Sequence, residues 1–390
     1  KGIIFMRLLH ISDLHIGKKV NEFSMLEDQK HILRQILEIA DNQRADGVMI
    51  AGDIYDKPVP TADAVQVFDW FLTELADRGK AVYAVSGNHD SAQRIAFGAQ
   101  LMGSRGVFLS PVYRGEISPL TLTDSYGELY LYLLPFIKPA TMRHVLKQAE
   151  EMEENSPMHY HEAVKLAVSR MGVDGTKRNI LVAHQFVTGA GRCDSEEEVV
   201  GGLDNVDADV FDVFDYVALG HIHSPQSIKR ETLRYCGTPL KYSFSEANQK
   251  KSVTVVNLKE KGDIEISTVP LIPLHDMRKI RGTYLEVTAR SFYQEFDRED
   301  YVQITLTDED DIPDALQKLR VIYPNLMHFL YDNTRTKQKR VIENVAEIEH
   351  KSELELFAEL YELQNNRAMS DVQADFVAKM IEECKKGEED

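Results

Sequence analysis

The chain has little cysteine, with only Cys193, Cys236 and Cys384 among its 390 residues. Their odd number and wide spacing exclude a disulfide framework and a zinc site built on thiolates. Such cysteine usage is typical of a reducing compartment, and we expect a cytoplasmic protein. Long apolar runs are missing too. No stretch is long enough to span a bilayer and no charged-then-apolar leader opens the chain, so we expect no membrane association.

Positive charge is also scarce: 45 Lys and Arg stand against 63 Asp and Glu, a formal net charge of -18. This balance weighs against a nucleic-acid partner, because phosphate contacts need local positive charge. Residues 343–390 alone hold 14 acidic and 5 basic residues, which is half of the excess. The charge therefore weakens a DNA-binding function without excluding it, and local basic patches or a basic partner would have to supply the contacts.

The length predicts two or three domains, because 390 residues exceed one ordinary core. Pro270 and Pro273 indicate a linker near 270–277. We expect a main domain over 6–272, a small α/β domain over 276–342 and a helical module over 350–386. In the small domain, strands are predicted at 283–288, 301–307 and 326–331, and helices at 291–297 and 312–322. Capping boxes at Ser352–Glu355 and Ser370–Gln373 predict two amphipathic helices in the tail.

Strands and helices alternate in the first part of the chain, which is typical of an α/β layer fold. Strands are predicted at 6–12, 47–51 and 80–86, and helices at 25–43 and 61–78, the latter with Thr61 as a cap. Further strands are expected at 106–109, 128–134, 179–183 and 214–219, with a helical insert over 139–171. Short strands at 233–236, 252–258 and 263–269 predict a second sheet packed on the first.

Five of the predicted strands run into residues that can bind a metal. They are Asp13 with His15, Asp53, Asn88 with His89, His184, and His221 with His223. Residues two apart in an extended segment point the same way, and parallel strands bring their carboxyl ends to one edge. The sequence therefore predicts a cluster of nitrogen and oxygen ligands without thiolate, which suits Mn²⁺, Fe²⁺ or Zn²⁺.

Each of these motifs also has a structural explanation. A single buried histidine is usually a hydrogen-bonded core residue, and a single Gly-Asp pair is usually a turn. Five independent strand ends that all present ligands favour a metal centre over coincidence. His159 and His161 in the helical insert are different, because residues two apart on a helix lie on different faces, so the structural explanation is preferred there.

The motifs Asp13-x-His15, Gly52-Asp53, Gly87-Asn88-His89-Asp90, His184 and Gly220-His221-x-His223 together resemble those of the calcineurin-like metallophosphoesterases. Within this family, the stretches 235–240 and 242–246 and the order of domains resemble the SbcD nuclease subunits of bacterial SbcCD complexes. The resemblance implies a four-layer α-β-β-α sandwich, a small α/β capping domain that binds DNA, and a C-terminal helical hairpin that binds a partner.

The resemblance also implies roles for the motif residues. One metal would be held by Asp13, His15, Asp53 and His223, and the second by Asp53, Asn88, His184 and His221; both are expected to be Mn²⁺. His89 would stabilise the transition state or protonate the leaving oxygen, and Asp90 would hold the ring of His89. Some family members have a phosphate-contacting histidine where this chain has Asp56, so we leave Asp56 outside the catalytic set.

The implied function is a two-metal exonuclease and endonuclease for duplex ends and hairpins. It would act in double-strand break processing, recombination and replication, in the nucleoid, as the nuclease subunit of an ATP-gated complex.

The implied partners are DNA, the SbcC ATPase bound through 350–386, and a second copy of the chain. For this homodimer, the helix 61–78 (Val65, Phe68, Phe71 and Leu72) and the region after Asp90 are candidates, although that helix face can equally be core. A small-molecule or protein phosphoesterase with the same metal core is the main alternative, and an inactive metal-binding scaffold is the second.

Overall fold

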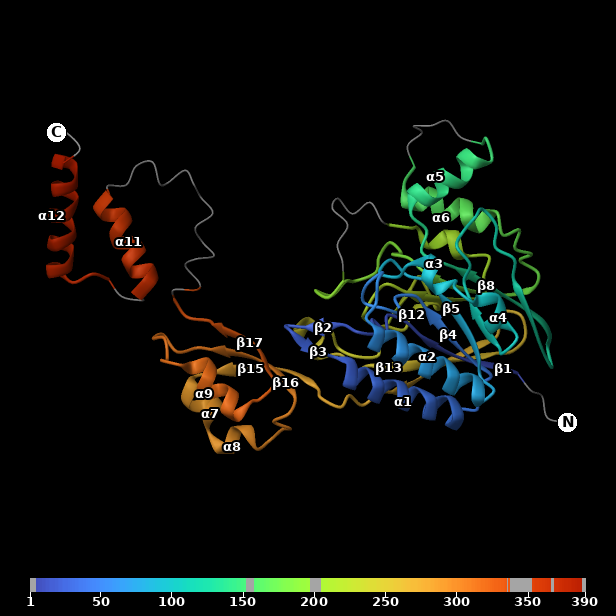
Figure 1. Cartoon of the computed structure of the whole chain (residues 1–390), viewed down its shortest axis with the longest axis horizontal. Helices are drawn as coiled ribbons and strands as arrows, with labels where there is room; N and C mark the ends of the chain where they lie inside the picture. Colours follow the sequence, from blue (N-terminus) through green and yellow to red (C-terminus); the bar gives the residue numbers. More distant parts are fainter. Residues whose placement is uncertain are drawn as a thin grey trace. The chain divides into compact units, whose positions relative to one another are not determined.

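The computed structural model describes residues 5–151, 158–196, 205–334, 336, 353–365 and 368–387. The chain divides into two compact units, Lys1–Asp276 and Met277–Asp390 (Figure 1). Among the helices within the described ranges, none combines the length and the apolar character that crossing a membrane requires.

The first sheet of the N-terminal unit has six strands in the order β14-β13-β1-β4-β5-β6. β1, β4, β5 and β6 are parallel, and β13 pairs antiparallel with β1. The bounds are β1 Met6–Ile11, β4 Gly47–Ala51, β5 Ala81–Val85, β6 Val107–Leu109, β13 Ser252–Leu258 and β14 Ile264–Pro270. A separate hairpin of two short strands, β2 Lys19–Val20 and β3 Phe23–Ser24, follows β1.

The second sheet has six strands in the order β11-β12-β10-β9-β8-β7. The bounds are β7 Leu120–Asp124, β8 Gly127–Leu134, β9 Arg178–His184, β10 Tyr216–Gly220, β11 Gln226–Ile228 and β12 Arg230–Tyr235. The expectation that 252–258 and 263–269 belong to this sheet is wrong. Both strands extend the first sheet instead, because β13 forms hydrogen bonds along the free edge of β1.

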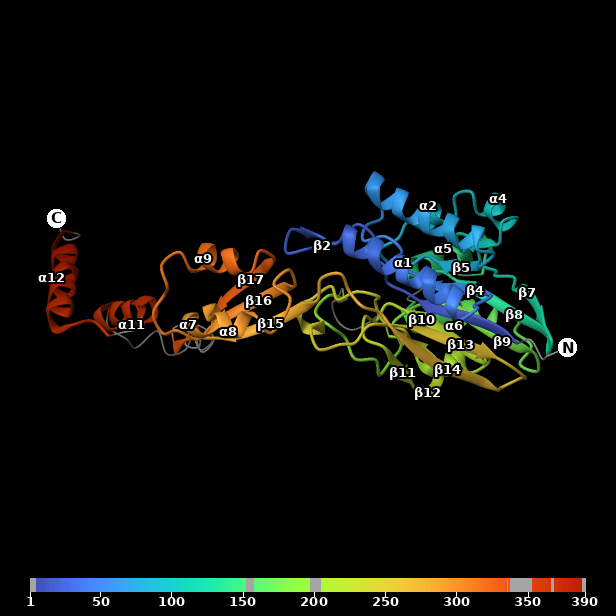
Figure 2. The same ribbon diagram turned by 90° about the horizontal axis from the view of Figure 1, so that it is seen from below.

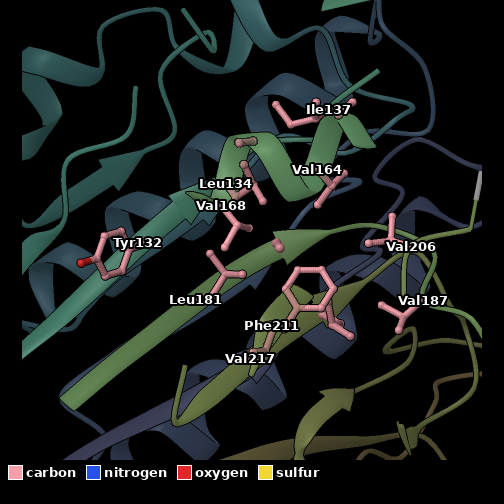
Figure 3. Packing of buried hydrophobic residues seen from close by; sticks show 14 of the residues in the cluster. Tyr132, Leu134, Ile137, Val164, Val168, Leu181, Val187, Val206, Phe211 and Val217 are labelled. Atoms are coloured by element: carbon pink, nitrogen blue, oxygen red, sulfur yellow. The ribbon is translucent and has the colours of Figure 1, made fainter. Parts of the chain in front are cut away.

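The two sheets pack face to face, and a helical layer covers each outer face. Apolar side chains such as Val85 of β5 and Val182 of β9 fill the space between the sheets. α1 (Leu26–Asn42) and α2 (Ala62–Asp77) lie side by side, and α2 contacts β5 of the first sheet (Figure 2). α5 (Pro139–Gln148) and α6 (Tyr160–Ser169) cover the second sheet, where Val164 and Val168 face Leu181 of β9 (Figure 3). The predicted four-layer sandwich is confirmed.

The remaining helices of this unit are short. They are α3 Ala92–Ile95, α4 Ala99–Gly103, and two 3-10 turns, η1 Ala208–Phe211 and η2 Phe244–Glu246. The predicted cap of α2 is confirmed, because Thr61 Oγ1 accepts a hydrogen bond from the backbone N–H of Ala64.

The prediction that α2 contributes an apolar face to a dimer is wrong for three of its four residues. Phe68, Phe71 and Leu72 are buried within the chain itself, and only Val65 is exposed. These three side chains therefore belong to the core and cannot face a second copy.

The C-terminal unit begins with a three-stranded parallel sheet, ordered β15-β16-β17, and the short helices α7, α8 and α9 lie between its strands. The bounds are β15 Met277–Gly282, β16 Tyr301–Leu306, β17 Leu326–Tyr331, α7 Tyr284–Thr288, α8 Arg290–Tyr293 and α9 Ala315–Ile322. The prediction of a strand at 283–288 is wrong. Thr283 and Glu286 form a capping box that begins α7, and this local hydrogen bonding outweighs the β-branched residues of the segment.

Two helices follow, α11 (Glu353–Asn365) and α12 (Asp371–Gly387). The capping box at Ser370–Gln373 is confirmed, since each residue's backbone N–H is bonded by the other's side chain. Gln373 also donates to the hydroxyl of Tyr361, which joins α12 to α11. The other predicted capping box includes Ser352, which lies outside the described residues, as do 337–352 as a whole.

Candidate metal centre

The ligand-type residues lie at or after the strand ends, and four of the eight have left-handed backbone. Asp13, His15 and Asp53 have φ angles of 53°, 44° and 48°, and His221 has φ 103°. The premise that Asp13 and His15 alternate along an extended strand is therefore wrong. Their side chains converge because left-handed turns follow β1 and β4, and these turns are joined by the bonds Asp13 N–H to Gly52 O and His15 N–H to Asp53 O, at 3.0 and 2.9 Å.

The cluster forms where the carboxyl ends of strands from both sheets meet, and not along the edge of one sheet as predicted. The first sheet supplies Asp13, His15, Asp53, Asn88 and His89, and the second supplies His184, His221 and His223. Three groups have ligand atoms close enough to hold a metal ion: Asp13 with His15 and His223, His15 with Asp53 and His89, and Asp13 with Asp53 and His184.

Two glycines allow the motif loops to approach this closely. A Cβ on Gly87 would lie 2.5 Å from the backbone nitrogen of Asp53 and would also overlap its carboxylate. A Cβ on Gly220 would overlap the carbonyl oxygen of Ala51 and lie 2.8 Å from the ring of His184. A side chain at Gly87 would therefore push the loops after β4 and β5 apart, and one at Gly220 would push the two sheets apart.

His184 and His221 both face the side-chain oxygen of Asn88. His184 Nε2 and His221 Nδ1 each lie 2.9 Å from Asn88 Oδ1. The other ring nitrogen of His184, Nδ1, lies 2.8 Å from the carbonyl oxygen of Ala51 and must donate to it. Nε2 of His184 is therefore the nitrogen that faces the centre, where it lies 3.4 Å from Asp53 Oδ2.

His15 and His223 face each other through their Nε2 atoms, 3.2 Å apart. In addition, His15 Nδ1 and His221 Nε2 are buried and have no hydrogen-bond partner among the described residues. Buried polar nitrogens are normally paired, and the facing Nε2 atoms of His15 and His223 can share only one proton, so the unpaired nitrogens of this cluster suit a bound cation. The donor set of imidazole, carboxylate and amide groups fits divalent Mn²⁺, Fe²⁺ or Zn²⁺.

The electrostatics of the cluster divide the histidines into two kinds. Burial lowers the pKa of His15 and of His221 well below the usual range, so both rings are neutral and offer lone pairs. Burial acts the same way on His184, but the charges of Asp53 and Asp13 outweigh it and raise its pKa to about 9. Burial raises the pKa of Asp13 to about 7. Without a metal, His184 and Asp13 therefore hold protons that balance the charges of the cluster. A divalent cation can take the place of these protons.

His89 lies at the same centre but makes a different set of contacts. Its backbone N–H donates to Asp53 Oδ1 at 2.9 Å, and its ring Nδ1 lies 3.0 Å from the carbonyl oxygen of Asp56. The carboxylate of Asp56 bonds the ammonium group of Lys18 at 2.8 Å. Asp56 therefore orders the loop and orients His89 through its backbone.

Asp90 does not hold the ring of His89 as expected. Its carboxylate accepts hydrogen bonds from the backbone N–H groups of Ile54, Tyr55 and Gly87, at 3.0, 3.0 and 2.9 Å. Burial and the nearby charge of Asp53 raise its pKa to about 6. Asp90 is thus a positioning residue that ties the loop after β4 to the loop after β5.

Sequence reasoning missed the residues that support the cluster from behind. Gln29 of α1 donates to the backbone oxygen of His15 at 2.7 Å and accepts from Gly17 N–H at 3.0 Å, and the hydroxyl of Tyr242 donates to Leu14 O at 2.5 Å. A buried polar residue within an amphipathic helix was the available signal for Gln29. His159 and His161 have structural roles, since His159 is the N-cap of α6 and His161 accepts a hydrogen bond from the backbone N–H of Asp207.

The chain is similar in sequence to two protein families and in structure to several solved proteins. The sequence profile of the calcineurin-like phosphoesterases matches residues 6–225, and the profile SbcD_C, described as the type 5 capsule protein repressor C-terminal domain, matches residues 273–365. One similar solved structure is TT1561 of Thermus thermophilus, with 13% identity and a TM-score of 0.38; the match covers 68% of this chain and 99% of that one. Another is a dimetal phosphatase from Danio rerio, with 12% identity and a TM-score of 0.43; the match covers 68% of this chain and 96% of that one. Because the first profile spans more than half of the sequence, the chain belongs to the calcineurin-like phosphoesterases, a family of metal-dependent hydrolases, and it carries a C-terminal domain of the SbcD type.

Proposed function

We propose that the chain is a two-metal DNA exonuclease and endonuclease that cleaves duplex ends and hairpins as the nuclease subunit of an ATP-gated SbcCD-type complex. One observation carries the proposal: a buried phosphoesterase metal cluster and a C-terminal domain of the SbcD type occur in one chain. In this proposal 6–272 is the nuclease domain, 276–342 the DNA-binding capping domain and 350–386 the ATPase-binding module. The protein would serve break processing, recombination and replication in the bacterial cytoplasm, at the nucleoid.

The proposed ligands divide between two Mn²⁺ ions. Asp13, His15 and His223 would hold the first, Asn88, His184 and His221 the second, and Asp53 would bridge both. The central position of Asp53, whose Oδ2 lies 3.8 Å from His15 Nε2 and 3.4 Å from His184 Nε2, supports the bridging role. When bound, the ions would supply Lewis acidity toward the phosphodiester and lower the pKa of a bound water.

His89 is proposed to act on the leaving group or on charge in the transition state. Its Nδ1 is engaged with the carbonyl oxygen of Asp56, so the ring presents Nε2, which lies 3.9 Å from Asp53 Oδ2 at the rim of the cluster. The side chain is 16% exposed, unlike the buried rings of His15 and His184, so substrate can reach it. A proton delivered from Nε2 to the departing oxygen is worth about 10²–10⁴-fold in rate.

The test is cleavage with Mn²⁺ of three substrates: duplex DNA with free ends, hairpin DNA and p-nitrophenyl phosphate. We expect His89→Ala to lose DNA cleavage by about 10²-fold or more while retaining both metals. The control His144→Ala, at an exposed histidine of α5, should leave cleavage unchanged. Turnover of the phosphomonoester without DNA cleavage, even with the ATPase present, would overturn the proposal and favour a small-molecule or protein phosphoesterase.

The exposed apolar side chains of the tail support docking onto a partner. In α12, Val372, Phe376 and Met380 are spaced four residues apart and are 79%, 64% and 47% exposed. In α11, Phe357 and Leu360 are also exposed. Apolar residues at this spacing line one face of a helix, which suits docking against partner helices.

Deletion of 350–390 should abolish association with the ATPase subunit, measured by co-purification, and leave metal-dependent cleavage by the bare nuclease. The single change Phe376→Asp should have the same effect, whereas Asp375→Asn, at the neighbouring exposed position, should not. A complex that survives both the deletion and Phe376→Asp would refute the tail assignment.

The proposed homodimer is supported by the region after Asp90. Phe97 and Leu101 are each 81% exposed, and Leu101 lines a cavity of about 350 Å³ together with Met102 and Arg105. We expect Phe97→Ser with Leu101→Ser to convert a dimer to a monomer in light scattering. An unchanged mass for this double variant would place the dimer contact elsewhere.

A further inference from the structure

A buried series of hydrogen bonds supports His223 on the side away from the metal cluster. His223 Nδ1 lies 2.6 Å from Ser195 Oγ, and the same hydroxyl lies 2.6 Å from Glu246 Oε1. The other oxygen of Glu246 lies 2.6 Å from the ammonium group of Lys251. His223, Glu246 and Lys251 are 2%, 0% and 6% exposed. The series therefore runs from a buried ion pair, through one hydroxyl, to the imidazole.

The direction of the hydrogen bonds follows from the chemistry of the groups. A carboxylate paired with an ammonium group can only accept, so Ser195 must donate its hydroxyl proton to Glu246. The oxygen of Ser195 is then left to accept, and His223 must donate its Nδ1 proton to it. The proton of the neutral ring is thereby fixed on Nδ1. The lone pair is fixed on Nε2, the atom that faces His15 Nε2 at 3.2 Å.

The backbone of His223 is fixed by the same groups. Lys251 donates to the carbonyl oxygen of His223 at 2.9 Å, and the carboxylate of Glu196 accepts from its backbone N–H at 2.7 Å. Thr238 also bonds Lys251, at 2.7 Å, which holds the ammonium group in place. Ring and backbone are therefore both restrained, and the orientation of Nε2 does not depend on a bound ion.

We propose that Ser195, Glu246 and Lys251 act as a relay that positions His223 to bind one of the two metals. The inference rests on the proposed ligand role of His223. A ligating histidine commonly donates its other ring proton to a carboxylate, which fixes the ring and raises its basicity. In this chain a serine hydroxyl stands between the histidine and the carboxylate. Ser195 and Glu196 follow β9 in the chain, so these two residues support the metal centre although neither is a proposed ligand.

The test is calorimetric titration of Mn²⁺ into the metal-free full chain. We expect Ser195→Ala to weaken one of two binding events by about 10–100-fold and to leave the other unchanged, because the relay touches only His223. Ser195→Thr retains the hydroxyl and should restore most of the affinity. Ser227→Ala is the matched control, since Ser227 bonds Glu231 on the surface of the same unit without a histidine. Ser195→Ala also leaves two buried groups without their partner, so its unfolding temperature in EDTA should fall somewhat; a loss of affinity confined to one binding event is what distinguishes the relay from this general destabilisation.

The outcomes separate this inference from the proposal on which it rests. If His223→Ala loses one binding event and Ser195→Ala retains both at wild-type affinity, the relay is refuted and the ligand assignment stands. If His223→Ala retains both events, the ligand assignment of His223 fails and the relay with it. Equal weakening in Ser195→Ala and Ser195→Thr would also refute the relay, because the hydroxyl would then be irrelevant.

Discussion

His10 makes the stability of the N-terminal unit depend on pH, and the size of the effect follows from its contacts. The ring is fully buried in β1 and lies between the two sheets, with Nδ1 2.9 Å from the hydroxyl of Tyr216 and Nε2 3.1 Å from the carbonyl oxygen of Leu219. A neutral ring satisfies both groups, since it accepts from the tyrosine and donates to the carbonyl. Burial lowers the pKa of His10 from 6.5 to about 3.

The unfolded chain therefore binds a proton at His10 below pH 6.5, whereas the folded chain does not bind it until about pH 3. The contribution to stability is fully present above pH 6.5 and is lost as the pH falls toward 3. The loss is about 2 kcal/mol at pH 5 and about 5 kcal/mol in total. His10→Gln keeps a donor and an acceptor for Leu219 and Tyr216 but cannot titrate.

The assay is urea unfolding of both proteins in EDTA at pH 8 and pH 5. On going to pH 5 the wild-type chain should lose about 2 kcal/mol more of its unfolding free energy than His10→Gln, because all other titrating groups are shared. His144→Gln, at an exposed position, should lose as much as the wild type. Equal losses in the wild type and His10→Gln would refute the claim that His10 is held neutral between the sheets.

Three further substitutions test the supports of the metal cluster. Gln29→Leu leaves the backbone groups of the loop after β1 without partners, which costs about 1–3 kcal/mol of unfolding free energy for each group. Urea unfolding should show this loss, and Mn²⁺ titration should show a weaker affinity. Unchanged values in both measurements would contradict the supporting role of Gln29. Gly87→Ala places a Cβ 2.5 Å from the backbone nitrogen of Asp53, so at least one metal-binding event should disappear, and a variant that binds both metals normally would show that the loops can move apart. Asp90→Asn replaces an acceptor oxygen by a donor facing a backbone N–H and should cost about 1.5–3 kcal/mol; a loss of cleavage at unchanged stability would instead restore a direct catalytic role for Asp90.

The sequence alone indicates which ligand-type residues follow strand ends, because the type of a residue and the end of an apolar run can both be read locally. Apolar runs such as 81–85 mark buried strands, and polar turns after them mark the functional edge. The backbone conformation that brings these side chains together could not be predicted from the sequence pattern. Left-handed backbone at Asp13 and Asp53 is stabilised by hydrogen bonds between loops distant in sequence, and periodicity contains no information on such bonds.

Long-range pairing explains the other corrections. β13 reads as a buried strand and β14 as a partly exposed one, and neither pattern indicates a partner strand. The place of β13 beside β1 is set by edge hydrogen bonds between residues more than 200 positions apart. The apolar face of α2 carries Phe68 and Phe71 at the spacing that a core or a dimer contact would equally require. Lys251, which directly precedes β13, supports His223 from a distant part of the chain, so no spacing motif identifies it.

The division of the cluster between two sheets has a consequence for the whole unit. Asp53 and Asn88 come from one sheet, and His184, His221 and His223 come from the other. A cation bound by ligands from both sheets links the two layers, so the layers can separate only after the cation is released. The resistance of this unit to unfolding should then rise with the logarithm of free metal concentration, at about 1.4 kcal/mol for each tenfold increase above the dissociation constant of one ion. Metal supply would thus set the equilibrium stability of this unit as well as the occupancy of its metal centre.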